Sequence, residues 1–77
     1  MPVKKVCVIT GGTSGIGLCT AQAMLEKGYT VYELSRREAG NPGMYHIPTD
    51  VTDPEACQRA IDAVISQAGR IDVMVNN

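Results

Sequence analysis

Strand-like runs and helical stripes alternate along the whole of this 77-residue chain. Four short runs rich in apolar and β-branched residues predict strands, at positions 3–9, 30–34, 44–48 and 71–75. Between them lie two segments in which apolar residues recur every three or four positions, 15–27 and a second that ends near position 69. A continuous apolar run is typical of a parallel strand that is buried on both faces. The alternation therefore predicts an α/β fold with a parallel sheet.

Each helical segment has one stripe that we expect to face the sheet. The first stripe consists of Ile16, Cys19, Thr20, Ala23, Met24 and Lys27. The second consists of Cys57, Ala60, Ile61, Val64, Ile65 and Ala68. Gly28 stands where a glycine would end the first helix. Thr52-Asp53-Pro54-Glu55 combines a capping-box spacing with a proline suited to the first turn, which predicts the start of the second helix.

The connection between the second and third strands is too short for an ordinary crossover helix. Only about nine residues, which include Gly40, Pro42 and Gly43, separate the two strands, so we expect an irregular loop there. With right-handed crossovers, the four strands should lie in the order 3-2-1-4. This order is the N-terminal half of a doubly wound Rossmann fold, which makes residues 1–77 a partial domain of that kind.

The composition is that of an ordinary globular interior. Hydrophobic residues make up 44% and charged residues 19% of the chain, which excludes the signature of a disordered segment. Seven Lys and Arg against eight Asp and Glu give a net charge of -1, so we expect neither nucleic acid nor an anionic membrane as a partner. No apolar run approaches the roughly 18 residues that would span a bilayer. We therefore expect a soluble, cytoplasmic protein.

The cysteines and the histidine have no metal-ligand spacing. Cys7, Cys19 and Cys57 fit neither a disulfide framework nor a CxxC pattern, so we predict free, buried thiols. His46 has no second histidine or carboxylate at ligand spacing and is predicted to be structural or exposed. The sequence therefore predicts no metal site.

A glycine-rich turn, Thr-Gly-Gly-Thr-Ser-Gly-Ile-Gly at positions 10–17, joins the first strand to the first helix. In this position Gly11 would make the tight turn, Gly15 would allow close approach of a pyrophosphate, and Gly17 would allow close helix packing. The N-terminus of the helix would supply unpaired N–H donors to the phosphates. A tight connector without a ligand is the alternative interpretation of the same glycines.

These eight residues match the TGxxxGxG fingerprint of the classical short-chain dehydrogenase/reductase family, which the chain resembles. Three further features are similar to that family and follow in the same order. They are Ser35-Arg36-Arg37 after the second strand, Asp50-Val51 after the third, and Asn76-Asn77, the start of the NNAG motif, after the fourth. The four matches cover essentially the whole chain.

The resemblance implies a role for each matching residue. The residues that it assigns to the pyrophosphate and the adjoining ribose are Gly11, Gly12, Thr13, Ser14, Gly15, Ile16 and Gly17. It implies that Asp50 accepts a hydrogen bond from the adenine amino group beside the Val51 backbone, and that Asn76 and Asn77 lie along the adenosine ribose. The alternative for Asp50 is a loop carboxylate near the cap of the second helix.

The residues after the second strand favour NADP over NAD. An NAD site carries an acidic residue there to bind the ribose 2′-hydroxyl, whereas a 2′-phosphate requires a cation in its place. Ser35 occupies the acidic position, and Arg36 can hold a phosphate bidentately with Arg37 as an auxiliary. The alternative is a solvated arginine pair that is neutralised by Glu33 and Glu38.

The catalytic residues of the family, a Ser, a Tyr-x-x-x-Lys and a supporting Asn, lie beyond its NNAG motif, where this sequence stops. Tyr29, Tyr32 and Tyr45 cannot replace the catalytic tyrosine because the residues four positions on are Glu33, Arg36 and Thr49. The resemblance thus implies the N-terminal fragment of a homo-oligomeric oxidoreductase that transfers hydride between a nicotinamide and a carbonyl or alcohol. The chain alone should be inactive.

A fragment of this kind should expose its fourth strand as an apolar edge. The expected partners of that edge are the missing C-terminal half or a second copy of the chain. Two other possibilities stay open at this stage: a complete, non-catalytic nucleotide-binding or regulatory module, and a structural piece that completes the sheet of another chain.

Overall fold

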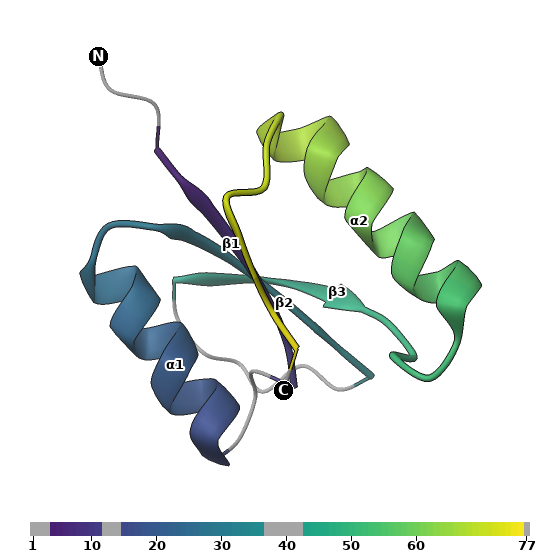
Figure 1. Ribbon diagram of the computed structural model, residues 1–77, viewed down its shortest axis with the longest axis horizontal. Coiled ribbons are helices and arrows are strands. Elements are labelled where there is room, and N and C mark those ends of the chain that lie inside the picture. Colours follow the sequence, from purple (N-terminus) through teal and green to yellow (C-terminus); the bar gives the residue numbers. More distant parts are fainter. Residues whose placement is uncertain (1–3, 12–14, 37–42, 77) are drawn as a thin grey trace.

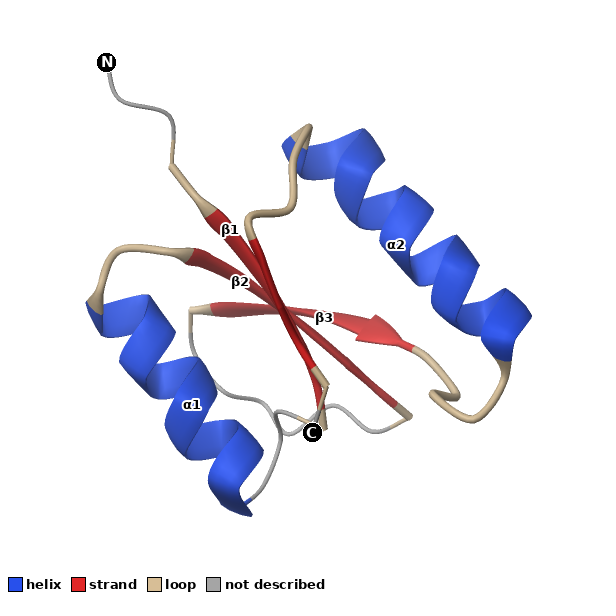
Figure 2. Ribbon diagram, viewed as in Figure 1, coloured by secondary structure: helices blue, strands red, loops and turns tan. Residues whose placement is uncertain are grey.

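A computed structural model describes residues 4–11, 15–36 and 43–76 and has the predicted α/β architecture (Figure 1). Its elements are β1 (Val6–Thr10), α1 (Gly15–Glu26), β2 (Thr30–Ser35), β3 (Met44–Pro48), α2 (Pro54–Ala68) and β4 (Val73–Val75). All three strand pairings are parallel and the order is β3-β2-β1-β4, as predicted. The two helices cover opposite faces of this sheet (Figure 2).

The bounds of the elements differ from the sequence prediction mainly at β1 and β4. β1 begins at Val6 and continues through Thr10, while β4 is shortened to Val73–Val75. β2 is longer by one residue, Ser35, than expected. The irregular loop that we predicted between β2 and β3 lies largely outside the described residues, since positions 37–42 are not described.

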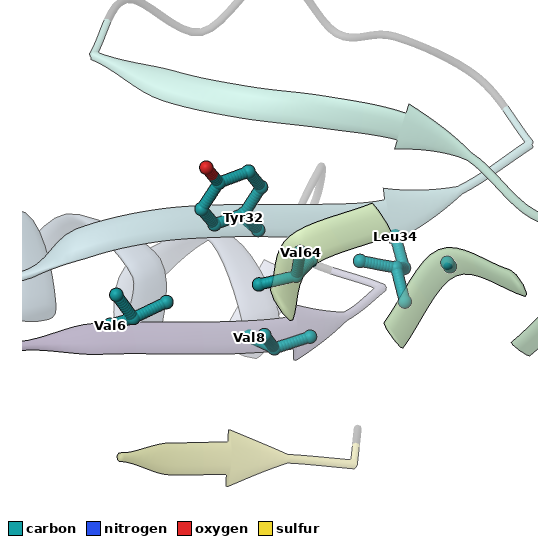
Figure 3. Close-up of a cluster of buried hydrophobic side chains, with 6 residues drawn as sticks. Val6, Val8, Tyr32, Leu34 and Val64 are labelled. Atoms are coloured by element: carbon teal, nitrogen blue, oxygen red, sulfur yellow. The ribbon is translucent and has the colours of Figure 1, made fainter. Parts of the chain in front are cut away.

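Two apolar clusters hold the layers together, one on each face of the sheet. Alternate residues of a strand point to opposite faces, so Tyr32 and Leu34 of β2 face α2 while Val31 and Glu33 face α1. On the α2 side, Figure 3 shows the packed side chains of Val6, Val8, Tyr32, Leu34 and Val64. On the α1 side the fully buried residues are Cys7, Ile9, Ala21 and Val31.

The predicted inner face of α1 is wrong for most of its residues, although Met24 does pack against the sheet. Ile16 is 79% exposed and Cys19 is also exposed, whereas Gly17 and Ala21 are buried against the sheet. Apolar residues surround this helix almost completely, so their spacing does not identify the inner face. The smallest residues allow the helix to approach the strands most closely, and they therefore decide which side of α1 faces the sheet.

Exposure of Cys19 also corrects the prediction of buried thiols. Cys7 is buried, and burial raises the pKa of its thiol, while Cys57 is half-buried. All three thiols are free, as predicted.

The capping-box spacing implies that Thr52 is the N-cap of α2, but in the structure α2 starts one residue later. Asp53 is the N-cap, and its Oδ1 accepts a hydrogen bond of 3.0 Å from the backbone N–H of Glu55. Pro54 occupies the first helical turn, where its missing N–H costs nothing. At the other end, Gly69 adopts φ +80° and donates its N–H to the Ile65 carbonyl at 2.8 Å.

A charged pair joins the start of β4 to the start of β1. The Asp72 carboxylate accepts hydrogen bonds from Arg70 Nε at 2.9 Å and from the backbone N–H of Val6 at 2.8 Å. The backbone N–H of Asp72 in turn donates to the Val6 carbonyl at 2.8 Å. The Arg70 hydrogen bonds, followed by that of the Val6 N–H, lower the pKa of Asp72. The carboxylate is therefore stabilised in its ionised form in the folded protein.

We predict that Asp72→Asn reduces the acid sensitivity of the fold. A carboxyl group with a lowered folded-state pKa stabilises the protein above its unfolded pKa of about 4, and this stabilisation is lost as the pH falls below that value. The variant should be less stable than the wild type at neutral pH, and the difference should shrink as the pH falls from about 4. Urea denaturation across this range measures it. Asp62→Asn, on the exposed face of α2, is the control, and an unchanged acid profile in Asp72→Asn would contradict the assignment.

Candidate nucleotide-binding site

The carboxyl ends of the four parallel strands bring the predicted site residues to one edge of the sheet (Figure 2). The glycine turn follows β1, Arg36 follows β2, Asp50 follows β3 and Asn76 follows β4. Helix α1 begins at this same edge, so its N-terminus lies there. In open α/β sheets, ligands bind at the carboxyl ends of the strands. The binding crevice lies beside the strand at which the strand order reverses direction. Here that strand is β1.

Two glycines of the turn, Gly11 and Gly15, adopt a positive φ, which favours glycine over other residues. Gly11 has φ +67° and donates its N–H to the Leu34 carbonyl at 3.2 Å, which ties the turn to the end of β2. Gly15 has φ +59°, and a Cβ atom built there would meet no atom within 4 Å. That open space is where a ligand could approach the backbone. Gly12, Thr13 and Ser14 lie outside the described residues.

The first turn of α1 is suited to an anion. Its backbone N–H groups have no partner within the helix, and the helix dipole places partial positive charge there. Residues 15–18 include no acidic side chain that would compete for these donors. Gly17, which lies within this turn, is buried.

Arg36 and Asp50 lie near one another at the edge of the sheet. Two hydrogen bonds from Thr52, at 2.6 Å from its hydroxyl and 3.0 Å from its N–H, lower the pKa of Asp50, and the positive charge of Arg36 lowers it further. The Thr52 bonds give Asp50 the local structural role that the alternative interpretation predicted, and they fix the orientation of its carboxylate. Arg36 is exposed, while Arg37 is outside the described residues.

Exposed apolar groups accompany these polar ones. Val51 is 47% exposed next to Asp50, and Ile16 is exposed beside the glycine turn. Between α2 and the end of β4 lies a hollow of about 250 Å³, lined by Thr10, Leu34, Val51, Cys57, Ile61, Met74 and Asn76. The edge therefore offers phosphate donors, a cation and apolar surface together, the combination that a nucleotide requires. Asn77 is not described.

The sequence prediction missed a buried polar cluster below this edge. Glu33 is only 1% exposed, and its Oε1 lies 2.7 Å from Nδ1 of His46 and 2.9 Å from the Ser35 hydroxyl that donates to it. A role for Glu33 was predicted only in the alternative interpretation, as a counter-ion of the arginine pair, and His46 was predicted to be structural or exposed. The parallel register aligns Glu33 with His46 across β2 and β3, a pairing that sequence spacing alone does not reveal.

Other described features do not add chemistry to the site. The rings of Tyr32 and Tyr45 stack with their centres 5.1 Å apart, so both take part in packing. Within residues 4–11, 15–36 and 43–76, no three His, Cys, Asp or Glu side chains group as metal ligands. Neither described helix is long and apolar enough to cross a membrane.

Comparison with known proteins agrees with the geometry. The family described as short chain dehydrogenase matches residues 5–77. This chain belongs to the short-chain dehydrogenase family. Among its relatives, a 3-ketodihydrosphingosine reductase of Bacteroides thetaiotaomicron is 39% identical over 95% of this chain and 28% of the relative. The 3-oxoacyl-acyl-carrier-protein reductase MabA of Mycobacterium tuberculosis is 36% identical over 97% of this chain and 30% of its own length.

Solved structures of two dehydrogenases have the same fold. The ligand-free aldohexose dehydrogenase of Thermoplasma acidophilum superposes with a TM-score of 0.93 at 36% identity, over 96% of this chain and 29% of that enzyme. A short-chain dehydrogenase of Streptomyces avermitilis gives a TM-score of 0.86 over 96% of this chain and 30% of its own. The chain thus corresponds to the N-terminal portion of these proteins and spans under a third of their length.

We predict that Gly15→Val abolishes nucleotide binding, whereas Gly28→Val leaves it unchanged. Both glycines have positive φ and open space at the Cβ position, at opposite ends of the α1 region. Each substitution should therefore cost a similar amount of stability, about 1–2 kcal/mol. Only the valine at position 15 would project into the space where a pyrophosphate approaches. Titration with NADPH measures the affinity, and equal affinities in the two variants would mean that Gly15 serves only as a connector.

Proposed function

We propose that this chain is the NADP-binding, N-terminal portion of an oxidoreductase that transfers hydride between a nicotinamide and a carbonyl or alcohol. Membership of the short-chain dehydrogenase family supports NAD(P) as the cofactor class. The two relatives named above are both reductases by name. The bound nicotinamide would donate or accept the hydride, and the residues of this chain would hold the rest of the dinucleotide.

The observation that carries the choice of NADP is the cation at the end of β2. Arg36 is exposed at the ligand-binding edge, and its charge reaches Asp50 at the end of the next strand. An exposed guanidinium can bind the 2′-phosphate with two parallel hydrogen bonds. Ser35 stands in the position where an NAD site would carry its acidic residue. Arg37 would act as the auxiliary cation.

The remaining contacts would follow the edge of the sheet. Residues 11–17 would bind the pyrophosphate and adjoining ribose through backbone N–H groups, with Gly15 permitting the approach. Asp50 and Val51 would flank the adenine. Asn76 and Asn77 would lie beside the adenosine ribose. None of these contacts supplies a general acid, so we propose that the 77-residue chain alone does not catalyse the reaction.

β4 is the last strand at one border of the sheet, and its outer side is where a further partner would pack. β4 pairs with β1 on one side, and Met74 at its centre is 44% exposed. In the relatives, more than two thirds of the sequence lies outside the match. We propose that such a C-terminal part, in a homo-oligomeric cytoplasmic enzyme, covers this border.

We predict that the double variant Ser35→Asp/Arg36→Gln selectively weakens binding of NADPH. The change removes the charge-assisted contacts of the 2′-phosphate and adds a repulsive carboxylate, a loss of about 2–4 kcal/mol. NADH lacks this phosphate, so its affinity should be preserved. Isothermal titration with both nucleotides in the full-length protein measures the two affinities.

Lys27→Gln is the control for the loss of one positive charge, because Lys27 is exposed beyond the opposite end of α1. It should leave the NADPH affinity unchanged. Equal losses for NADPH and NADH in the double variant would refute the assignment of Ser35 and Arg36.

We further predict that the 77-residue chain in isolation self-associates through β4 or folds only partly, and does not oxidise NADPH with any carbonyl. Exposed apolar surface destabilises the isolated sheet by about 25 cal/mol for each Å². Sedimentation velocity at micromolar concentration, followed by nucleotide titration, tests this expectation. A monodisperse monomer that unfolds cooperatively and binds NADPH tightly would favour the autonomous nucleotide-binding module instead.

A further inference from the structure

The Glu33–His46 pair lies directly beneath the edge at which we place the 2′-phosphate. The side chains are 2% and 11% exposed, and their atoms Oε1 and Nδ1 are 2.7 Å apart. The same Oε1 accepts the hydroxyl hydrogen of Ser35 at 2.9 Å, and Ser35 is the neighbour of Arg36. A continuous path of two hydrogen bonds thus connects an ionisable ring on β3 to the residue that occupies the cofactor-selecting position.

The surroundings of this pair on the α1 face are otherwise uncharged within the described part of the chain. Ile9 of β1 stands beside Glu33 in the strand register, and the residues of α1 that pack on this face are Ala21, Met24 and Leu25. The other titratable side chains in the same cluster are the Cys7 thiol and the Tyr29 phenol. Burial raises the pKa of Cys7 and so keeps that thiol neutral. Arg36 and Asp50 lie at the carboxyl edge itself.

We propose that His46, acting through Glu33 and Ser35, makes the preference of this site for NADP over NAD depend on pH. The proposal rests on the function proposed above and identifies two positioning residues that the glycine fingerprint and the arginines do not include. His46 does not touch the cofactor. It changes the charge and the hydrogen bonding of the residues beneath the 2′ position.

The direction of this pH effect follows from charge alone. Histidine is the side chain whose charge ordinarily changes near neutral pH. When His46 gains a proton, the buried cluster becomes more positive by one charge, whatever other groups contact Glu33. The low dielectric around a buried pair transmits that change more strongly than water would. A 2′-phosphate dianion is favoured by the protonated state, whereas a 2′-hydroxyl is nearly indifferent to it.

The test is the ratio of the NADPH and NADH affinities, measured by titration of the full-length protein between about pH 6.5 and pH 8.5. In the wild type, this ratio should increase about three- to tenfold as the pH falls across the range. His46→Gln cannot gain the charge, so its ratio should stay near the wild-type value at high pH. Glu33→Gln removes the negative charge of the pair, so its ratio should be high throughout the range.

His46→Gln also controls for titration of the phosphate itself, because the 2′-phosphate of the free nucleotide protonates in the same way whichever variant is titrated. If the ratio of the wild type follows that of His46→Gln at every pH, the inference is wrong, although the Arg36 site can still be right. If NADPH does not bind at all, the proposed function fails first.

A second measurement keeps the test decisive should either substitution unfold the protein. Linkage requires that NADPH raise the pH midpoint at which the His46 ring titrates in the wild type, as followed by NMR of the ring, and that NADH move it less. Equal midpoints with the two nucleotides would overturn the proposal.

Discussion

Parallel pairing of β1 with both β2 and β4 is the constraint on which the rest of this structure depends. Residues 6–10 pair with β2 along their whole length, and residues 7–9 also pair with β4 on the other side. Both neighbours run in the same direction, so every loop that leaves a carboxyl end reaches one edge of the sheet. The glycine turn, Arg36, Asp50 and Asn76 become neighbours through this topology although they are far apart in the sequence. Helix α1 then has to begin at that edge, with its positive end toward it.

The packing that supports the edge uses small residues on one face and larger ones on the other. Gly17 and Ala21 bring α1 close to the sheet, whereas Val64 of α2 fills the space against Tyr32 and Leu34 (Figure 3). The side chains of Glu33 and His46 are only 2% and 11% exposed, so a change of charge there is weakly screened by water.

Much of the fold could be predicted because each element carries its own local signal. β-Branched runs indicated the strands. Gly28 and Gly69 stand at the ends of the two helices, where both adopt a positive φ. The strand order followed from the handedness of crossovers. The inner face of α1 could not be predicted, because a helix that is apolar on nearly all sides has no periodic signal. The Asp53 cap was missed because both Thr52 and Asp53 are good capping residues, and tertiary context selects between them.

The glycine turn and Arg36 could be proposed as site residues from the sequence because each belongs to a short contiguous motif. The Glu33–His46 contact could not, because it depends on the register between β2 and β3, which sequence spacing alone does not reveal. Glu33 and His46 are 13 positions apart, and only the alignment of β2 with β3 places them opposite one another. Buried polar pairs of this kind are visible only when the sheet is assembled.

A crystal structure of the full-length protein with NADP⁺ would show directly where the dinucleotide binds. We expect the pyrophosphate oxygens within about 3 Å of backbone N–H groups in the glycine turn and the first turn of α1, with the 2′-phosphate on the Arg36 guanidinium. The adenine should lie beside Asp50 and Val51. A dinucleotide bound at the opposite edge of the sheet, in the hollow lined by Lys4, Tyr29 and Tyr45, would contradict this expectation.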